Sequence, residues 1–193
     1  MNITAVTIQE IEAFIAQFPI YEYRIIDAKE IDFSERVRYI CEHECDRYGT
    51  TWACPPGVGT LSACESKCRR YDSGFFFSSV AEVQDIMNFK ELLSTRMEHE
   101  KITDAVKQYF LHRGIDCYTL STESCEICDV CTYPAAPCRF PEKMNPCVES
   151  HGIVVAELVE KYNMEYNLGG NTVLWFSLIL LMKGLSADGT SPD

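Results

Sequence analysis

The sequence predicts an α+β or α/β fold, in which a small mixed sheet is covered by helices and two cysteine-rich metal-binding loops lie outside it. The apolar content is 47%, which is enough to build a packed core in a chain of 193 residues. Helical and strand-like patterns alternate along the chain, and neither a repeat nor a linker divides it. We therefore expect residues 1–193 to form a single compact domain, with cysteine loops at about 41–68 and 125–147.

The first part of the chain contains a helix, a strand and a loop-rich segment. Apolar residues at helical spacing predict a helix over Ile8–Phe18, and partial alternation predicts a strand over Tyr21–Asp27. Residues 41–68 are rich in cysteine and in loop-forming residues. A short helix over Leu61–Tyr71 closes this segment, and Thr60 suits its N-cap position.

The middle of the chain predicts a strand, a long helix and a second strand. Aromatic residues give Gly74–Val80 the character of a strand. An approximately helical apolar stripe runs through Glu82–Arg113, as one long helix or two abutting ones, and Gly114 is a suitable residue to end it. The short segment Ile115–Leu120 reads as a strand. The second cysteine loop follows it directly.

The last part predicts a helix and a buried strand. Asn145–Pro146 resembles an N-cap followed by proline at the first helical position, so we expect a helix from there to about Tyr162. Glu149 and His151 then fall in its first turn. Val173–Met182 is a continuous apolar run, which is typical of a strand buried on both faces. It is too short for the ~20 residues that span a bilayer.

Charge and leader patterns narrow the partners and the compartment. The formal net charge of −12 repels nucleic acid and anionic lipid, so we expect neither nucleic acid nor a membrane as a partner. The first residues lack the basic and apolar regions of a signal peptide, which predicts a cytoplasmic protein. In a reducing compartment, eleven cysteines more often hold metal than form disulfides.

The second loop has the spacing of an iron–sulfur ligand set. Cys125, Cys128 and Cys131 recur at every third position, and Cys138 follows after six residues. Three thiolates at this spacing can project from one tight loop onto a [4Fe–4S] cluster, while the fourth comes from farther away. Zinc ribbons use two separate Cys-x2-Cys knuckles, whereas the two units here share Cys128. We therefore predict a [4Fe–4S] cluster held by these four cysteines, with zinc as the alternative.

The fourth ligand of this loop has a rival. Bacterial ferredoxin loops have three residues before the fourth cysteine and a proline after it, whereas six residues precede Cys138 and Arg139 follows it. Cys147 lies at the predicted start of the last helix, where the helix dipole favours a thiolate or an anionic cluster. We prefer Cys138 and place Cys147 second.

A second metal site is predicted from the first loop and the short helix after it. These segments carry five further cysteines, namely Cys41, Cys45, Cys54, Cys64 and Cys68. Cys64 and Cys68 are one helical turn apart, so both can face one site. The set is sufficient for a second cluster or a zinc ion, and His43 is another conceivable ligand. Alternatively, Cys64 and Cys68 are core residues of a short helix.

Two cysteine motifs, taken together, carry a family resemblance. The first is the Cys-x3-Cys…Tyr-Gly…Cys-Pro-Pro order from residue 41, and the second is the Cys-x2-Cys-x2-Cys…Pro-Cys-Arg-x-Pro-Glu order from residue 125. In these motifs the chain resembles an uncharacterised prokaryotic family of predicted metal-binding proteins of unknown function. The resemblance covers about Cys41 to Met182 and implies metal binding but no reaction. The positions that it matches are Cys41, Cys45, Cys54, Cys125, Cys128, Cys131 and Cys138.

The sequence therefore supports three hypotheses about function. The first is a protein with one or two [4Fe–4S] clusters that transfers electrons to a redox partner protein or serves an anaerobic redox enzyme. The second is a non-enzymatic interaction module fastened by zinc, which binds without sulfide. The third is an iron–sulfur enzyme with an iron open to substrate, which predicts a cluster held by only three thiolates. No residue is identified as catalytic, and the sequence leaves the oligomeric state open.

Overall fold

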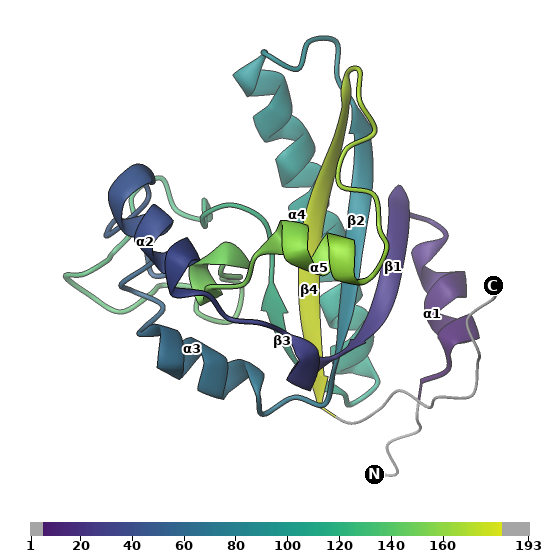
Figure 1. The fold of residues 1–193 in the computed structure, drawn as a ribbon, viewed down its shortest axis with the longest axis horizontal. Helices are drawn as coiled ribbons and strands as arrows, with labels where there is room; N and C mark the ends of the chain where they lie inside the picture. The colour runs from purple at the N-terminus through teal and green to yellow at the C-terminus, as the bar shows by residue number, and fades with distance from the viewer. Residues whose placement is uncertain (1–5, 183–193) are drawn as a thin grey trace.

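The computed structural model describes residues 6–182, which fold around one four-stranded sheet. Its strand order is β1-β2-β4-β3, and each pair of neighbours is antiparallel (Figure 1). The predicted α+β class is confirmed, and the named strands form an antiparallel sheet in place of the mixed sheet expected. The strands are β1 (Ile20–Asp27), β2 (Ser73–Glu82), β3 (Asp116–Leu120) and β4 (Thr172–Met182).

Helices cover the sheet, and several begin at the caps that the sequence provides. Thr7 forms a capping box with Glu10, and the Thr60 hydroxyl accepts a hydrogen bond from Ala63 N. No helix within residues 6–182 combines the length and the apolar character that crossing a membrane requires. The helices are α1 (Ile8–Ile15), α2 (Glu35–Glu44), α3 (Leu61–Cys68), α4 (Phe89–His112) and α5 (Val155–Lys161), with 3-10 turns η1 (Ala28–Glu30) and η2 (Glu149–His151).

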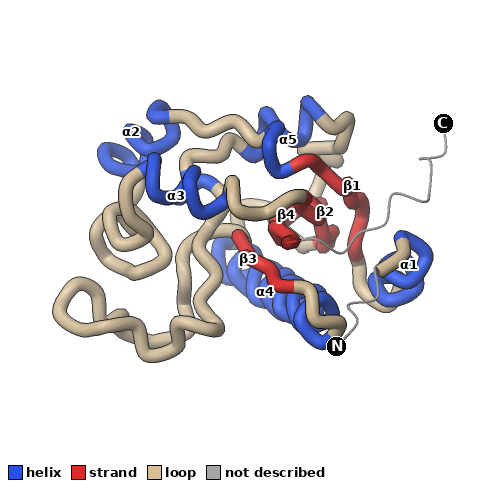
Figure 2. Tube along the Cα trace, turned by 90° about the horizontal axis from the view of Figure 1, so that it is seen from below, coloured by secondary structure: helices blue, strands red, loops and turns tan. Residues whose placement is uncertain are grey.

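The two faces of the sheet carry separate hydrophobic clusters, because alternate side chains of a strand point to opposite faces. On β2, Phe75 and Phe77 pack with residues of α1 and α4. Phe76, between them, packs with residues of α5 and with Cys68 of α3. Figure 2 shows α4 and α5 on opposite sides of the strands. The cysteine loops lie together at the end of the molecule away from α1 (Figures 1 and 2).

The long helix starts later than the sequence predicts. Its expected range was Glu82–Arg113, but α4 begins at Phe89, after Asn88 caps it by accepting a hydrogen bond from Glu91 N. Residues 81–82 instead extend β2 beyond the expected strand, because they pair with the start of β4. The helix ends as predicted, since Gly114 follows it with a φ of +76°.

The helix expected over Asn145–Tyr162 is wrong in its first half. Ser121 N donates a hydrogen bond to Pro146 O, and Val148 N donates one to Ser121 O. These backbone groups are satisfied by a parallel bridge to the end of β3, so they have no need of a helix. Consequently α5 begins only at Val155.

This correction changes the setting of three residues. Cys147 lies in the parallel bridge with Ser121 and not at a helix N-terminus. Glu149 and His151 lie in η2, which precedes α5 and is separated from it by a left-handed turn at Gly152. The helix-dipole argument for Cys147 therefore does not hold.

A polar cluster interrupts the core under α4. The ring of His99 is fully buried, with Nδ1 2.7 Å from Ser79 Oγ on β2 and Nε2 2.8 Å from Ser177 Oγ on β4. Ser177 Oγ also lies 2.9 Å from Thr103 Oγ1 and 3.0 Å from Ser121 Oγ. Burial lowers the pKa of His99 to about 3, so the ring stays neutral and joins α4 to the two central strands.

We predict that His99 makes the protein less stable in mild acid. The unfolded ring takes up a proton near its ordinary pKa of 6.5, whereas the folded ring does not, so lowering the pH below 6.5 favours the unfolded chain. Between pH 7 and pH 5 this residue should lower the free energy of unfolding by about 2 kcal/mol. His99→Gln replaces the ring with an amide, which can form hydrogen bonds but does not titrate. Urea unfolding of this variant should therefore depend less on pH. Equal pH dependence in both proteins would contradict the prediction.

Candidate metal centre

The four cysteines predicted to share the second site line one cavity. Cys125, Cys128, Cys131 and Cys138 all border a small cavity of about 20 Å³. Each of the four thiols is partly exposed. Burial raises the pKa of Cys125, and the charges of the Cys138, Cys131 and Cys128 thiolates raise it further. The donors are therefore close enough to repel one another as thiolates, which is the charge pattern that a metal cation relieves.

Hydrogen bonds within the loop explain how Cys138 reaches the other three. The chain folds back between Cys131 and Cys138, since Ala136 N donates to Thr132 O and Thr132 Oγ1 donates to Pro137 O. Arg139 Nη1 then donates to Val130 O across 2.8 Å and also borders the cavity. The six-residue gap is thus a compact turn that returns Cys138 to the start of the loop.

The first loop collects a second group of thiols. Cys41 lies on α2, Cys45 caps its C-terminal end, and Cys54 is buried in the turns that follow. Burial raises the pKa of Cys41, and the charges of the Cys45 and Cys54 thiolates act in the same direction. These three cysteines from the first motif thus lie within electrostatic range of one another.

Cys147 lies with this first group. Burial raises the pKa of Cys147 well above its ordinary value, and the charges of Glu149 and Cys54 raise it further. Its sulfur accepts a hydrogen bond from Ser150 N at 3.2 Å, within η2. Because η2 packs against α2, Cys147 also lies near the helix that carries Cys41.

Cys64 and Cys68 lie on the inward face of α3. Cys68 is fully buried in the hydrophobic cluster beneath that helix, and burial raises its pKa to about 12. The Cys64 thiol is also buried and lies 3.5 Å from Val58 O, to which it donates. A spacing of one helical turn therefore brings both thiols together, as predicted, but on the core side of the helix.

His43 lies outside both groups. Its ring stacks on Tyr39 at a centroid distance of 3.9 Å, and its Nδ1 lies 2.9 Å from Tyr39 O. Over residues 6–182, no three His, Cys, Asp or Glu side chains have the geometry of a metal site. Binding of a metal would therefore require the thiols of either group to change position.

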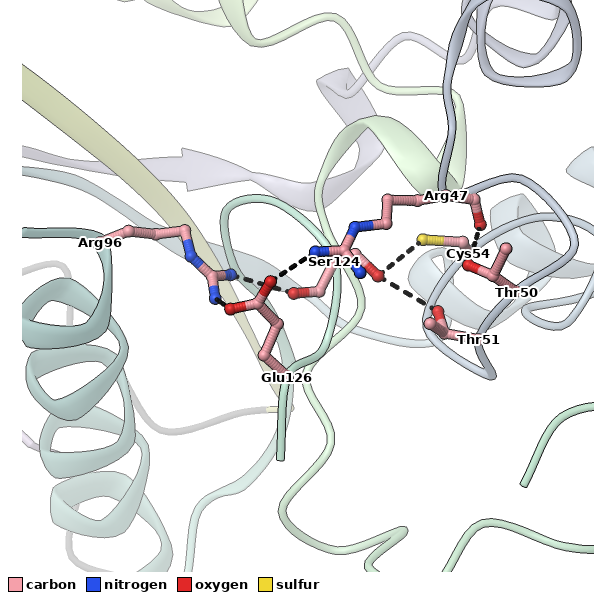
Figure 3. A network of polar contacts seen from close by, with 7 residues as sticks. All are labelled: Arg47, Thr50, Thr51, Cys54, Arg96, Ser124 and Glu126. Carbon is pink, nitrogen blue, oxygen red and sulfur yellow. Dashed lines mark hydrogen bonds and ion pairs between the residues drawn. The ribbon is translucent and has the colours of Figure 1, made fainter. Parts of the chain in front are cut away.

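Hydrogen bonds join the two cysteine loops through Ser124. Cys54 Sγ lies 3.2 Å from Ser124 Oγ and donates to it, and Thr51 Oγ1 lies 3.2 Å from the same oxygen. Trp52 Nε1 adds a bond from the first loop to Ala136 O at 3.1 Å. Ser124 directly precedes Cys125, so one hydrogen bond and one peptide unit separate a thiol of the first group from a residue of the second (Figure 3).

Arg96 ties this arrangement to the core, and sequence reasoning missed it. Arg96, on α4, is only 3% exposed, and its Nη1 donates to Ser124 O at 3.0 Å while its Nη2 pairs with Glu126 Oε2 at 2.6 Å. Glu126 also pairs with Arg47 of the first loop (Figure 3). No local pattern in the sequence marked this residue, because a charged side chain on a helix is normally exposed.

A family model matches the part of the chain that contains both groups of cysteines. The model described as "Predicted metal-binding protein (DUF2284)" matches residues 24–181. This range begins in β1, ends in β4 and includes all eleven cysteines. No curated protein and no solved structure matched the chain.

We predict that Glu126 contributes to stability mainly through Arg96. The Arg96 side chain is 4% exposed, whereas the Arg47 side chain is 48% exposed. Water therefore screens the Arg47–Glu126 ion pair far more than the Arg96–Glu126 ion pair. Double-mutant cycles with Arg96→Met, Arg47→Met and Glu126→Gln, measured by urea unfolding, should give a coupling energy of about 2 kcal/mol for Arg96. The Arg47 coupling should stay below about 1 kcal/mol. A larger coupling to Arg47 than to Arg96 would refute this ranking.

Proposed function

Because the chain belongs to the DUF2284 family of predicted metal-binding proteins, we propose that it holds two [4Fe–4S] clusters and transfers electrons. The observation that carries the proposal is the cavity lined by Cys125, Cys128, Cys131 and Cys138. Four thiolates are a complete ligand set for such a cluster, which supplies a one-electron redox centre when bound. Arg139 borders the same cavity and offsets the negative charge that four thiolates bring.

Zinc is the second candidate for this loop, and the size of the cavity favours it. A volume of about 20 Å³ holds one small species, and a [4Fe–4S] cluster is larger than a single zinc ion. The spacing favours the cluster, because the shared Cys128 leaves no pair of independent zinc knuckles. The loop lies outside the sheet, so its thiols can move without disturbing the core. We therefore retain the cluster as the first proposal.

For the second centre we propose Cys147 as the fourth ligand beside Cys41, Cys45 and Cys54. The electrostatic interaction between Cys147 and Cys54, and the packing of η2 on α2, support this set. The sequence had offered Cys64 or Cys68 for this position. Cys68 is buried in the hydrophobic cluster beneath α3, so taking up a metal there would disrupt that cluster, and the buried Cys64 thiol already donates to Val58 O.

The surroundings of the loops suit electron transfer to a partner protein. The bond from Cys54 to Ser124, the residue before Cys125, supports the passage of an electron between adjacent centres. Exposed apolar side chains surround the second loop at Ile127, Val130 and Phe140. A small apolar surface beside a redox centre is a suitable contact for a transient redox partner.

Metal and sulfide analysis tests the proposal. Protein purified without oxygen should be brown, absorb broadly near ~400 nm and contain about eight iron and eight sulfide, since each [4Fe–4S] cluster has four of each. Cys128→Ala should lower both contents to about four. Colourless wild-type protein with stoichiometric zinc and no sulfide would overturn the iron–sulfur proposal in favour of the zinc module.

The ligand assignment has its own test, in a matched pair of variants. Cys147→Ala should lower iron and sulfide from about eight to about four, because the first loop then has three thiols. Cys64→Ala removes a thiol that lies in the core and should leave both contents at about eight. Urea unfolding of both variants controls for loss of the fold. Full metal content in Cys147→Ala together with loss in Cys64→Ala would show that Cys64 is the ligand.

A further inference from the structure

We propose that a cavity between the two cysteine loops binds a small planar anion, such as an aromatic carboxylate, with Lys67 as its charge partner. The cavity has a volume of about 470 Å³, which lies in the range of small-molecule sites. It is formed where both loops, α3 and β3 meet. Residues from these segments that line it include Trp52, Val58, Lys67, Tyr118, Pro137 and Met144.

The walls of the cavity suit a flat apolar body. Trp52 contributes an indole whose Nε1 is already bonded to Ala136 O, so its ring is fixed in place. Pro134, Pro137 and Met144 supply further apolar surface from the second loop. Such a lining favours an aromatic or otherwise planar molecule over a sugar or another strongly hydrated one.

The charge in the cavity comes from Lys67. Its Nζ lies 3.7 Å from the centroid of the Tyr118 ring, and within residues 6–182 it has neither a hydrogen bond nor an ion pair. None of the described residues that line the cavity is acidic, although the chain carries a net charge of −12. Burial lowers the pKa of Lys67, and the nearby Arg70 lowers it further. A bound anion would neutralise this uncompensated positive charge.

Tyr118 holds this arrangement in place. Its hydroxyl lies 2.8 Å from Nε2 of His151, a buried ring whose pKa burial lowers to about 3. Nε2 of this neutral ring and the Tyr118 hydroxyl share one hydrogen bond, and Nδ1 lies 3.1 Å from Ser150 Oγ. Ser150 Oγ in turn donates to Cys147 O at 2.6 Å. A chain of hydrogen bonds thus connects the wall of the cavity to a cysteine of the first group.

The cavity is distinct from the proposed metal site but adjoins it. Cys138, Trp52 and Met144 border both this cavity and the smaller one lined by four cysteines. A molecule bound here would therefore lie next to the proposed second centre. Anion binding depends on Lys67 and Tyr118, which belong to α3 and β3, and so it does not require either loop to hold iron.

Binding of two probes that differ in charge tests the proposal. The full chain, purified without oxygen, is titrated with 2-naphthoate and with its neutral analogue 2-naphthylmethanol by isothermal titration calorimetry. The wild type should bind 2-naphthoate about tenfold more tightly, because only the carboxylate forms a charge-assisted bond with Lys67. Lys67→Gln should remove this difference without weakening the alcohol, and Lys67→Arg should largely keep it.

The controls separate this site from general attraction of anions. Lys90→Gln removes an exposed cation at the start of α4 and should leave both affinities unchanged. Wild-type binding of 2-naphthoate in Lys67→Gln would overturn the proposal, as would equal binding of the two probes or binding of neither. Iron and sulfide are assayed in the same samples, so a failure of the iron–sulfur proposal is seen separately from a failure of anion binding.

Discussion

The buried guanidinium of Arg96 connects α4 to the two cysteine loops, which together form the cysteine lobe, and the arrangement of this lobe depends on that connection. A charge that is removed from water must be paired, and Arg96 obtains its partners from Ser124 O and from the Glu126 carboxylate. Both partners flank Cys125, so the need to pair one charge fixes the start of the second cysteine loop. Ser124 Oγ then receives the Cys54 thiol, which places the first loop against the second.

The position of Arg96 follows from a change of polarity along one face of α4. Toward its C-terminal end, this face packs Ile102, Val106 and Phe110 into the hydrophobic cluster on that side of the sheet. Earlier on the same side, Arg96 and His99 are buried and polar. A wholly apolar face would pack equally well but would have no groups with which to hold a loop. The polar half of this α4 face therefore buries less apolar surface, but its hydrogen bonds and ion pair fix the helix to the cysteine lobe.

The sequence predicted what depends on local pattern and missed what depends on distant partners. Alternating, aromatic and continuous apolar runs identified the strands, and Thr60 identified the start of α3. The early start expected for the last helix was wrong, because the backbone near Pro146 pairs with Ser121 from another part of the chain. A charged residue such as Arg96 is normally expected on the surface of a helix, so its burial was not visible without its partners. The same limit applied to Cys147, which the contacts of η2 with α2 bring to the first loop.

The proposed ligand sets also account for the odd number of cysteines. Four thiols line the cavity of the second loop, and four from three separate segments gather around Cys54. Of the eleven cysteines this leaves three, namely Cys64, Cys68 and Cys117. Cys68 packs in the hydrophobic cluster beneath α3, the Cys64 thiol donates to Val58 O, and Cys117 packs against the cluster on the α4 side of the sheet, so none of the three joins either group of thiols. They also lie on α3 and β3, the elements that, with Lys67 and Tyr118, wall the cavity between the loops. These two elements thus direct their thiols toward the core, while Lys67 of α3 borders the cavity. The three thiols stabilise the fold, and the chemistry that we propose belongs to the cysteines of the loops.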